Sequence, residues 1–163
     1  MFKKEEWKAP FLKRDLKNVI LFGLLFAILG GILGGALDYL FYYIDFSIKI
    51  GLVIVSLMVG YMVYRSYNSY HILFPVLTIP FMILGLFVAH FTSSLINSGF
   101  SQFFNILGEG DFYLNFLVSP LSLLILGIKG GSAGNIIFGI INIVIYILAF
   151  YACYSIASSK KKK

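Results

Sequence analysis

The chain has 163 residues, of which 60% are hydrophobic and only 12% are charged, and its formal net charge at pH 7 is +6. Soluble domains are about half apolar and about a quarter charged, so this composition excludes an ordinary water-soluble protein and predicts one polytopic membrane domain over residues 1–163. The basic residues flank apolar segments, so we expect the lipid bilayer as a partner and no binding of nucleic acid.

Four apolar segments are long enough to be membrane spans, at about residues 19–43, 46–64, 72–96 and 135–157. Six Lys and Arg residues precede the first segment and four lysines end the chain, whereas the first and the last connection hold one lysine each. The positive-inside rule therefore predicts that both termini are cytoplasmic, which requires an even number of spans. The bias toward Lys, Ile and Phe favours a bacterial plasma membrane.

A further apolar segment at residues 112–128 contains Pro120, which interrupts the hydrogen-bond ladder of a helix. A fifth span at this place would put the final lysines outside the cell. We therefore predict a re-entrant or an interfacial segment on the outer side, with neither form favoured over the other, and a true fifth span is the less favoured alternative. The predicted fold class is an all-α integral membrane protein, a four-transmembrane-helix bundle with this outer segment.

The first segment contains the sequence LGGILGGALDY, in which two pairs of glycines are spaced four residues apart. Small residues at this spacing let helix backbones approach each other closely in lipid. The neighbouring helix is either another span of the same chain or the same helix of a second copy. We predict helix packing at these glycines, which are Gly30, Gly31, Gly34 and Gly35.

Asp38 shares a helix face with Gly30 and Gly34, so we expect it to point toward protein and away from lipid. Counting the helical rise along each span places Asp38, His90 and Asn142 in the same outer half of the membrane. We predict that these three side chains form a polar intramembrane cluster. Such a cluster is either a proton-sensitive or ion-sensitive site, or a hydrogen-bond network that fixes the packing of the helices.

At the inner boundary, Tyr61 and Tyr64 flank Arg65 near the end of the second span. One interpretation is a site for lipid headgroups or for a partner. The other is an aromatic belt with an arginine that extends its charged end to the interface. We expect His71 at the same boundary, in contact with water.

The sequence contains no motif of a known enzyme class, and we expect no catalytic residue, no metal and no cofactor. It predicts a noncatalytic small membrane subunit that assembles through its glycine-rich helix face, with copies of itself or with other membrane protein subunits. The subunit would be an oligomeric pore or transport component, or an accessory subunit of a larger membrane complex. The alternative function is a membrane-embedded enzyme that acts on lipid.

Overall fold

The computed structural model describes residues 12–43 and 49–159, and this part of the chain is built from helices. Three helical segments are long and apolar enough to cross a membrane, namely Lys13–Phe41, Leu73–Ser98 and Ala133–Ser158. A shorter apolar helix, Ile50–Ser66, has 17 residues. The predicted all-helical fold is therefore confirmed, and the three long helical segments have the length and composition of membrane spans in a multi-pass protein.

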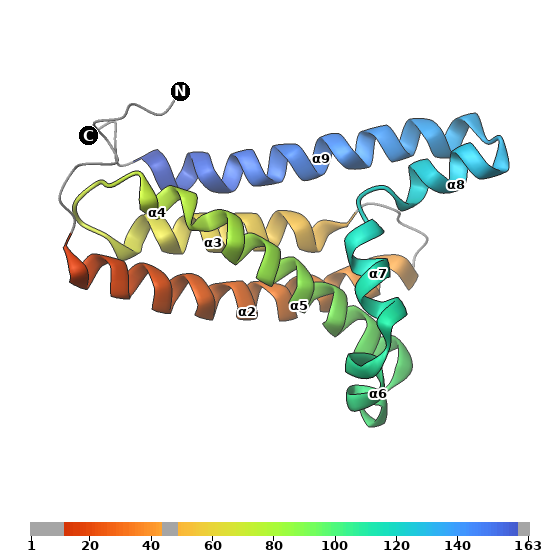
Figure 1. Ribbon diagram of the computed structural model, residues 1–163, viewed down its shortest axis with the longest axis horizontal. Helices are drawn as coiled ribbons and strands as arrows, with labels where there is room; N and C mark the ends of the chain where they lie inside the picture. The colour runs from red at the N-terminus through yellow and green to blue at the C-terminus, as the bar shows by residue number, and fades with distance from the viewer. Residues whose placement is uncertain (1–11, 44–48, 160–163) are drawn as a thin grey trace.

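The long helices run alternately up and down the bundle in the order α2 (Lys13–Tyr43), α3 (Ile50–Ser66), α5 (Thr78–Ser98) and α9 (Ala133–Ser158). The first residue of α2 and the last residue of α9 lie at the same end of the bundle (Figure 1). We call this the proximal end, and it also holds the C-terminus of α3. The opposite end, where α2 and α5 finish and α3 begins, is the distal end.

The predicted third span consists of two helices, α4 (Leu73–Val76) and α5, which are joined at Leu77. Pro75 and Pro80 lie in the first turns of these two helices, where proline removes no intrahelical hydrogen bond. The Thr78 hydroxyl donates to the carbonyl oxygen of Pro75 at 2.6 Å and stabilises the junction. The prolines therefore set a helix boundary near the proximal end.

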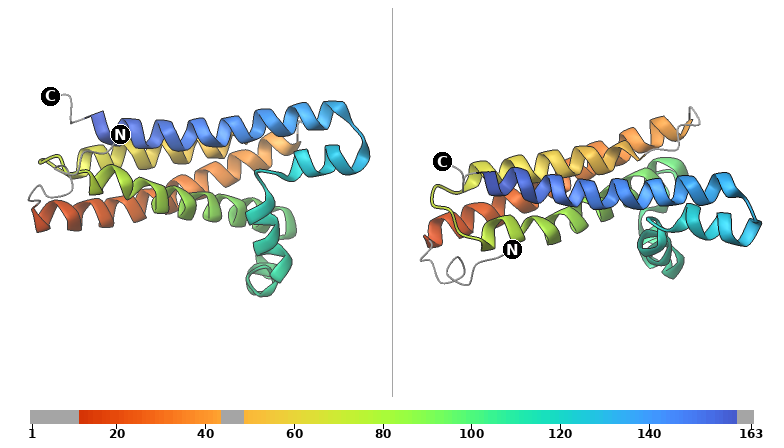
Figure 2. Two further views of the ribbon diagram at one scale, coloured as in Figure 1. Left: turned by 45° about the horizontal axis from the view of Figure 1, so that its top comes forward. Right: turned by 90° about the horizontal axis from the view of Figure 1, so that it is seen from above.

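The predicted outer segment is also divided, because Pro120 lies between α7 (Gly110–Val118) and α8 (Ser122–Gly130). The short helices η1 (Phe100–Gln102) and α6 (Phe103–Gly108) connect α5 to α7. α6 and α7 extend sideways from the distal end, whereas α8 lies beside the first turns of α9 and forms a hairpin with it (Figures 1 and 2). The two halves of the segment thus have different neighbours.

α3 is the central helix of the bundle, because it packs against α2, α5 and α9. Its buried side chains are small or medium in size, and they include Leu52, Val55, Val59 and Val63. A Cβ atom at Gly60 would lie 2.9 Å from the carbonyl oxygen of Cys153 in α9. Such backbone contacts without side chains between them are typical of helix packing in membranes.

Candidate functional site

The predicted packing glycines of α2 contact two different neighbouring helices. A Cβ atom at Gly34 would lie 2.8 Å from the Cα atom of Gly51 in α3, and one at Gly35 would lie 2.3 Å from the carbonyl oxygen of Ala89 in α5. All four glycines are buried, so this face of α2 is in contact with the chain's own helices. Gly30 and Gly34 face α3, and Gly31 and Gly35 face α5.

Asp38 lies one turn beyond Gly34, and its carboxylate caps the N-terminus of α3. The backbone N–H of Gly51 donates to Oδ1 of Asp38 at 2.7 Å, whereas Lys49 at the N-cap position makes no side-chain cap. The first N–H groups of a helix need acceptors from outside it, and the positive end of the helix dipole attracts a carboxylate. A Cβ atom at Gly51 would lie 2.6 Å from Oδ2, so the glycine is what lets the acid approach.

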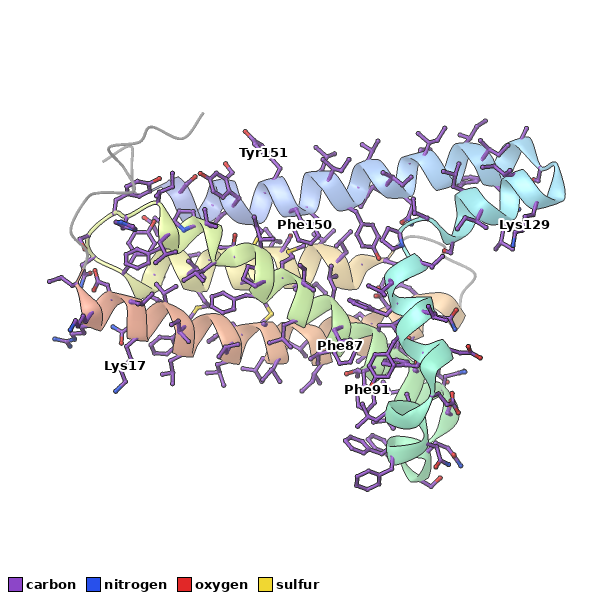
Figure 3. The ribbon with its side chains drawn as sticks, viewed as in Figure 1. Lys17, Phe87, Phe91, Lys129, Phe150 and Tyr151 are labelled. Carbon is purple, nitrogen blue, oxygen red and sulfur yellow. The ribbon has the colours of Figure 1, made fainter. Side chains whose placement is uncertain are left out.

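His90 belongs to an aromatic cluster that docks α7 onto α5. Its ring lies 5.0 Å from the ring of Phe112 and 6.0 Å from that of Phe116, both in α7. Phe87 and Phe91 extend the cluster along α5, at 5.7 and 5.9 Å from Phe112, and both point toward α7 (Figure 3). This docking could not be predicted from the sequence, because it is made by residues more than 20 positions apart.

Asn142 connects α9 to the turn between α7 and α8. Its amide nitrogen donates to the carbonyl oxygen of Pro120 at 3.1 Å. One turn further along α9, the hydroxyl of Tyr146 lies 3.2 Å from that of Ser119. Pro120 interrupts the helical hydrogen-bond ladder at this turn. The bonds from α9 therefore supply hydrogen-bond partners to polar groups of the turn.

The hydrogen bonds and ring contacts of residues 12–43 and 49–159 join Asp38, His90 and Asn142 to three different elements, and none joins two of these residues to each other. The described contacts are those of helix capping and packing, and a proton-sensitive or ion-sensitive cluster stays a prediction.

Arg65, Tyr61 and Tyr64 lie together on the surface of α3 near the proximal end. The guanidinium carbon of Arg65 is 5.2 Å from the centre of the Tyr61 ring, which is a cation–π distance. The rings of Tyr61 and Tyr64 are stacked with their centres 6.5 Å apart. Because Arg65 and Tyr61 are both exposed, this group is available to lipid headgroups or to a partner.

Asp15, which is only 2% exposed, was not among the predicted site residues. Its Oδ2 atom accepts hydrogen bonds from the backbone N–H of Asn68 at 3.0 Å, from that of Ser69 at 3.1 Å and from the Ser69 hydroxyl at 3.0 Å. Asp15 therefore ties the start of α2 to the turn between α3 and α4. An acid in the first turn of a helix is a recognisable signal, but the sequence does not show which turn it binds.

Tyr67, in the same turn, is fully buried, and its hydroxyl donates to the carbonyl oxygen of Ala157 in α9. Burial raises the pKa of the Tyr67 phenol, so the hydroxyl keeps its proton. The prediction that His71 contacts water is wrong, since His71 is 4% exposed and its Nδ1 accepts from the N–H of Leu73 at 3.1 Å. The turn folds inward and brings the His71 ring to 5.9 Å from that of Phe74.

An apolar groove with a volume of 430 Å³ lies between α2 and α5 in the distal half. Thr92 is its one polar side chain, so the groove suits an apolar group and offers no acid or base for catalysis. Its other lining residues are Ile32, Ala36, Val88, Phe91, Leu95, Ile96 and Phe100.

Within the described part of the chain, no group of three or more His, Cys, Asp or Glu residues is arranged to hold a metal ion. Comparison with protein-family models, with curated proteins and with solved structures gave no match for this chain.

Proposed function

We propose that the protein is a noncatalytic, multi-pass membrane subunit that assembles with another membrane-spanning chain along the exposed face of α9. In this proposal α2, α3, α4–α5 and α9 are four spans of a bacterial plasma membrane. The proximal end lies on the cytoplasmic side, in agreement with the lysines that flank the first and last spans.

The observation that carries the proposal is the low burial of α9. Only 17% of its most apolar 18-residue window is buried within the chain, compared with 39% for α2 and for α4–α5. A stripe of side chains on the uncovered face is 45–67% exposed, and the members are separated alternately by four and by three residues. They are Ile137, Ile141, Val144, Leu148 and Tyr151. We call these residues the α9 stripe.

Alternating spacings of three and four residues produce a seam that stays in contact with a second helix over its whole length. Lipid covers such a surface, but a partner helix also gains van der Waals packing along the seam. The glycine face of α2 is already in contact with α3 and α5, so assembly through the α9 stripe disturbs no contact within the chain.

In the proposed topology α6 and α7 lie on the outer membrane surface, which favours the interfacial form of the outer segment. They extend sideways from the bundle (Figures 1 and 2). Phe100 and Phe104 are 77% and 83% exposed, while Glu109 and Asp111 are also exposed. Aromatic rings gather on one side of α6 and polar atoms on the other (Figure 3), as expected for a helix between lipid and water.

Of the predicted functions, the accessory subunit has more support than a pore or a lipid-modifying enzyme. A pore needs polar groups along a path, but Asp38 caps α3, and Asn142 bonds to the turn at Pro120. An enzyme needs acids or bases that converge on its substrate, whereas the groove between α2 and α5 is lined almost entirely by apolar side chains.

Native mass spectrometry of the tagged protein, extracted from its own membrane in mild detergent, tests the proposal. We expect a complex of fixed stoichiometry with another chain or with further copies, and a single-chain mass alone would overturn the proposal. Cysteine crosslinking in membranes locates the surface, in a Cys153→Ala background. Leu148→Cys, on the stripe, should crosslink faster than Leu57→Cys, which is similarly exposed but lies on α3.

A further inference from the structure

At the proximal end of the bundle, the described cationic side chains are exposed and the described acidic side chain is buried. Among the described residues, Lys13, Arg14 and Lys17 of α2 and Arg65 of α3 are exposed at this end. The one described acid there is Asp15, which is 2% exposed. At this end the described charges that reach the surface are therefore all cationic.

The contacts of Asp15 explain this arrangement. Its carboxylate accepts three hydrogen bonds from the turn that follows α3, and Asp15 is buried whereas Arg14 and Lys17 are exposed on the surface of α2. A carboxylate that stayed on the surface would form ion pairs with these neighbours and compete with an outside anion for them. By burying Asp15, the fold leaves the cations of the first helical turns available to an outside anion.

These cations also lie at the depth of lipid headgroups. Lys17 is two residues before Val19, where the apolar part of α2 begins, and it projects outward from the helix (Figure 3). Arg65 rests on the Tyr61 ring, which leaves the N–H groups of its guanidinium available to a phosphate. In the sequence, the residues before Leu12 include Lys3, Lys4, Lys8, Glu5 and Glu6, and the residues after Ser159 are Lys160–Lys163.

The distal end has the opposite balance. It carries the acids Asp38, Glu109 and Asp111 and the cations Lys49 and Lys129 among its described residues. The attraction for an anionic surface is therefore restricted to one end of the molecule, although both ends meet a membrane–water boundary in the proposed topology.

We infer that the cationic group Lys13, Arg14, Lys17 and Arg65 binds the headgroups of anionic phospholipids at the proximal membrane surface. The lipid phosphate is the ligand, and the negative surface of the leaflet supplies the long-range attraction. This inference concerns lipid and does not depend on which chain occupies the α9 stripe.

Native mass spectrometry from mixed micelles tests the inference by counting the lipids that stay bound. The protein is equilibrated with equal amounts of phosphatidylcholine and phosphatidylglycerol, which differ in net headgroup charge. We expect the wild-type protein to retain phosphatidylglycerol in preference to phosphatidylcholine. Each single substitution, Lys17→Gln or Arg65→Gln, should lower this preference by about fivefold. Raising the ionic strength from about 0.1 M to about 1 M should reduce the preference, because the Debye length falls from about 10 Å to about 3 Å.

Lys129→Gln is the matched control, since it removes one exposed cation from the distal end. It should leave the preference unchanged, and Lys17→Arg should retain it. The inference is overturned if wild-type protein retains both lipids equally. It is also overturned if Lys129→Gln lowers the preference as much as Lys17→Gln does, because the attraction then reflects net charge alone.

Discussion

The two ends of the bundle are closed by different kinds of contact. At the proximal end, the side chains of Asp15 and Tyr67 form hydrogen bonds that tie the turn after α3 to α2 and α9. At the distal end, Gly34 and Gly51 bring the backbones of α2 and α3 together, and Asp38 then caps α3. The proximal closure is therefore sensitive to the loss of a polar atom, whereas the distal closure is sensitive to the gain of a methyl group.

The largest effect should come from adding a methyl group at the distal closure. In Gly34→Ala the new Cβ atom would lie 2.8 Å from the Cα atom of Gly51, and a helix backbone cannot move aside as a flexible side chain does. We expect a loss of about 3 kcal/mol in the free energy of unfolding, at the upper end for overpacking. Denaturant unfolding in detergent measures it. Gly110→Ala, where nothing lies within 4 Å, should be close to neutral, and equal effects would refute the close approach.

Removal of the proximal acceptor should have the next largest effect. Asp15→Ala leaves the N–H groups of Asn68 and Ser69 and the Ser69 hydroxyl without the oxygen that they now share. We expect a destabilisation of about 2–3 kcal/mol, as for buried donors that lose their acceptor. Asp15→Asn keeps one acceptor oxygen and should lose less. If both variants had the wild-type free energy of unfolding in the same assay, the hydrogen bonds of Asp15 would not be what stabilises the proximal end.

A smaller effect is expected for the acid at the distal end. Asp38→Ala removes the cap of α3 and should cost about 1–2 kcal/mol, in the range of lost helix caps. Asp38→Asn keeps an oxygen acceptor for the N–H of Gly51 and should be milder. The asparagine variant also tests the predicted proton-sensitive site. If any pH response of the wild-type protein persists in Asp38→Asn, Asp38 is not the titrating group.

Tyr67→Phe should cost about 1 kcal/mol near neutral pH, because it removes one hydrogen bond to the carbonyl oxygen of Ala157. The raised pKa of the buried Tyr67 phenol adds a pH dependence of known sign. The unfolded chain releases this proton above its ordinary pKa of about 10, so the wild-type protein loses stability as the pH rises further. The difference between wild type and Tyr67→Phe should therefore shrink above pH 10, and a widening difference would contradict the burial of the phenol.

The smallest effect is expected at the exposed surface of the proximal end. Arg65→Gln removes a cation–π contact with Tyr61 and should change the free energy of unfolding by no more than about 0.5 kcal/mol. Stability measured in uncharged detergent separates this contact from lipid binding. A loss of several kcal/mol would show that Arg65 closes the proximal end and is not simply a surface group.

The positions of the long helices could be predicted because a membrane span needs a long apolar run, which the sequence displays directly. The predicted span at residues 135–157 is found within α9, which covers Ala133–Ser158. The partner of Asp38 could not be predicted in the same way. The depth of the residues in the membrane suggested His90 and Asn142 as partners, whereas Asp38 accepts a hydrogen bond from the backbone N–H of Gly51. Every residue except proline carries such an N–H group, so the sequence does not show which one is the partner.

The sequence by itself determined the helical class, the apolar helices long enough to cross a membrane, the break at Pro120 and the close packing of α2 through its glycines, because each follows from local composition or spacing. Only the tertiary structure decided which glycines meet α3 and which meet α5, that Asp15 is buried, and that the turn at Tyr67 joins α2 to α9. These contacts depend on the rotation of each helix about its axis and on bonds between residues 53 and 90 positions apart. A periodic pattern within one helix identifies its buried face, but the neighbour that covers this face is chosen by the packing of the whole bundle.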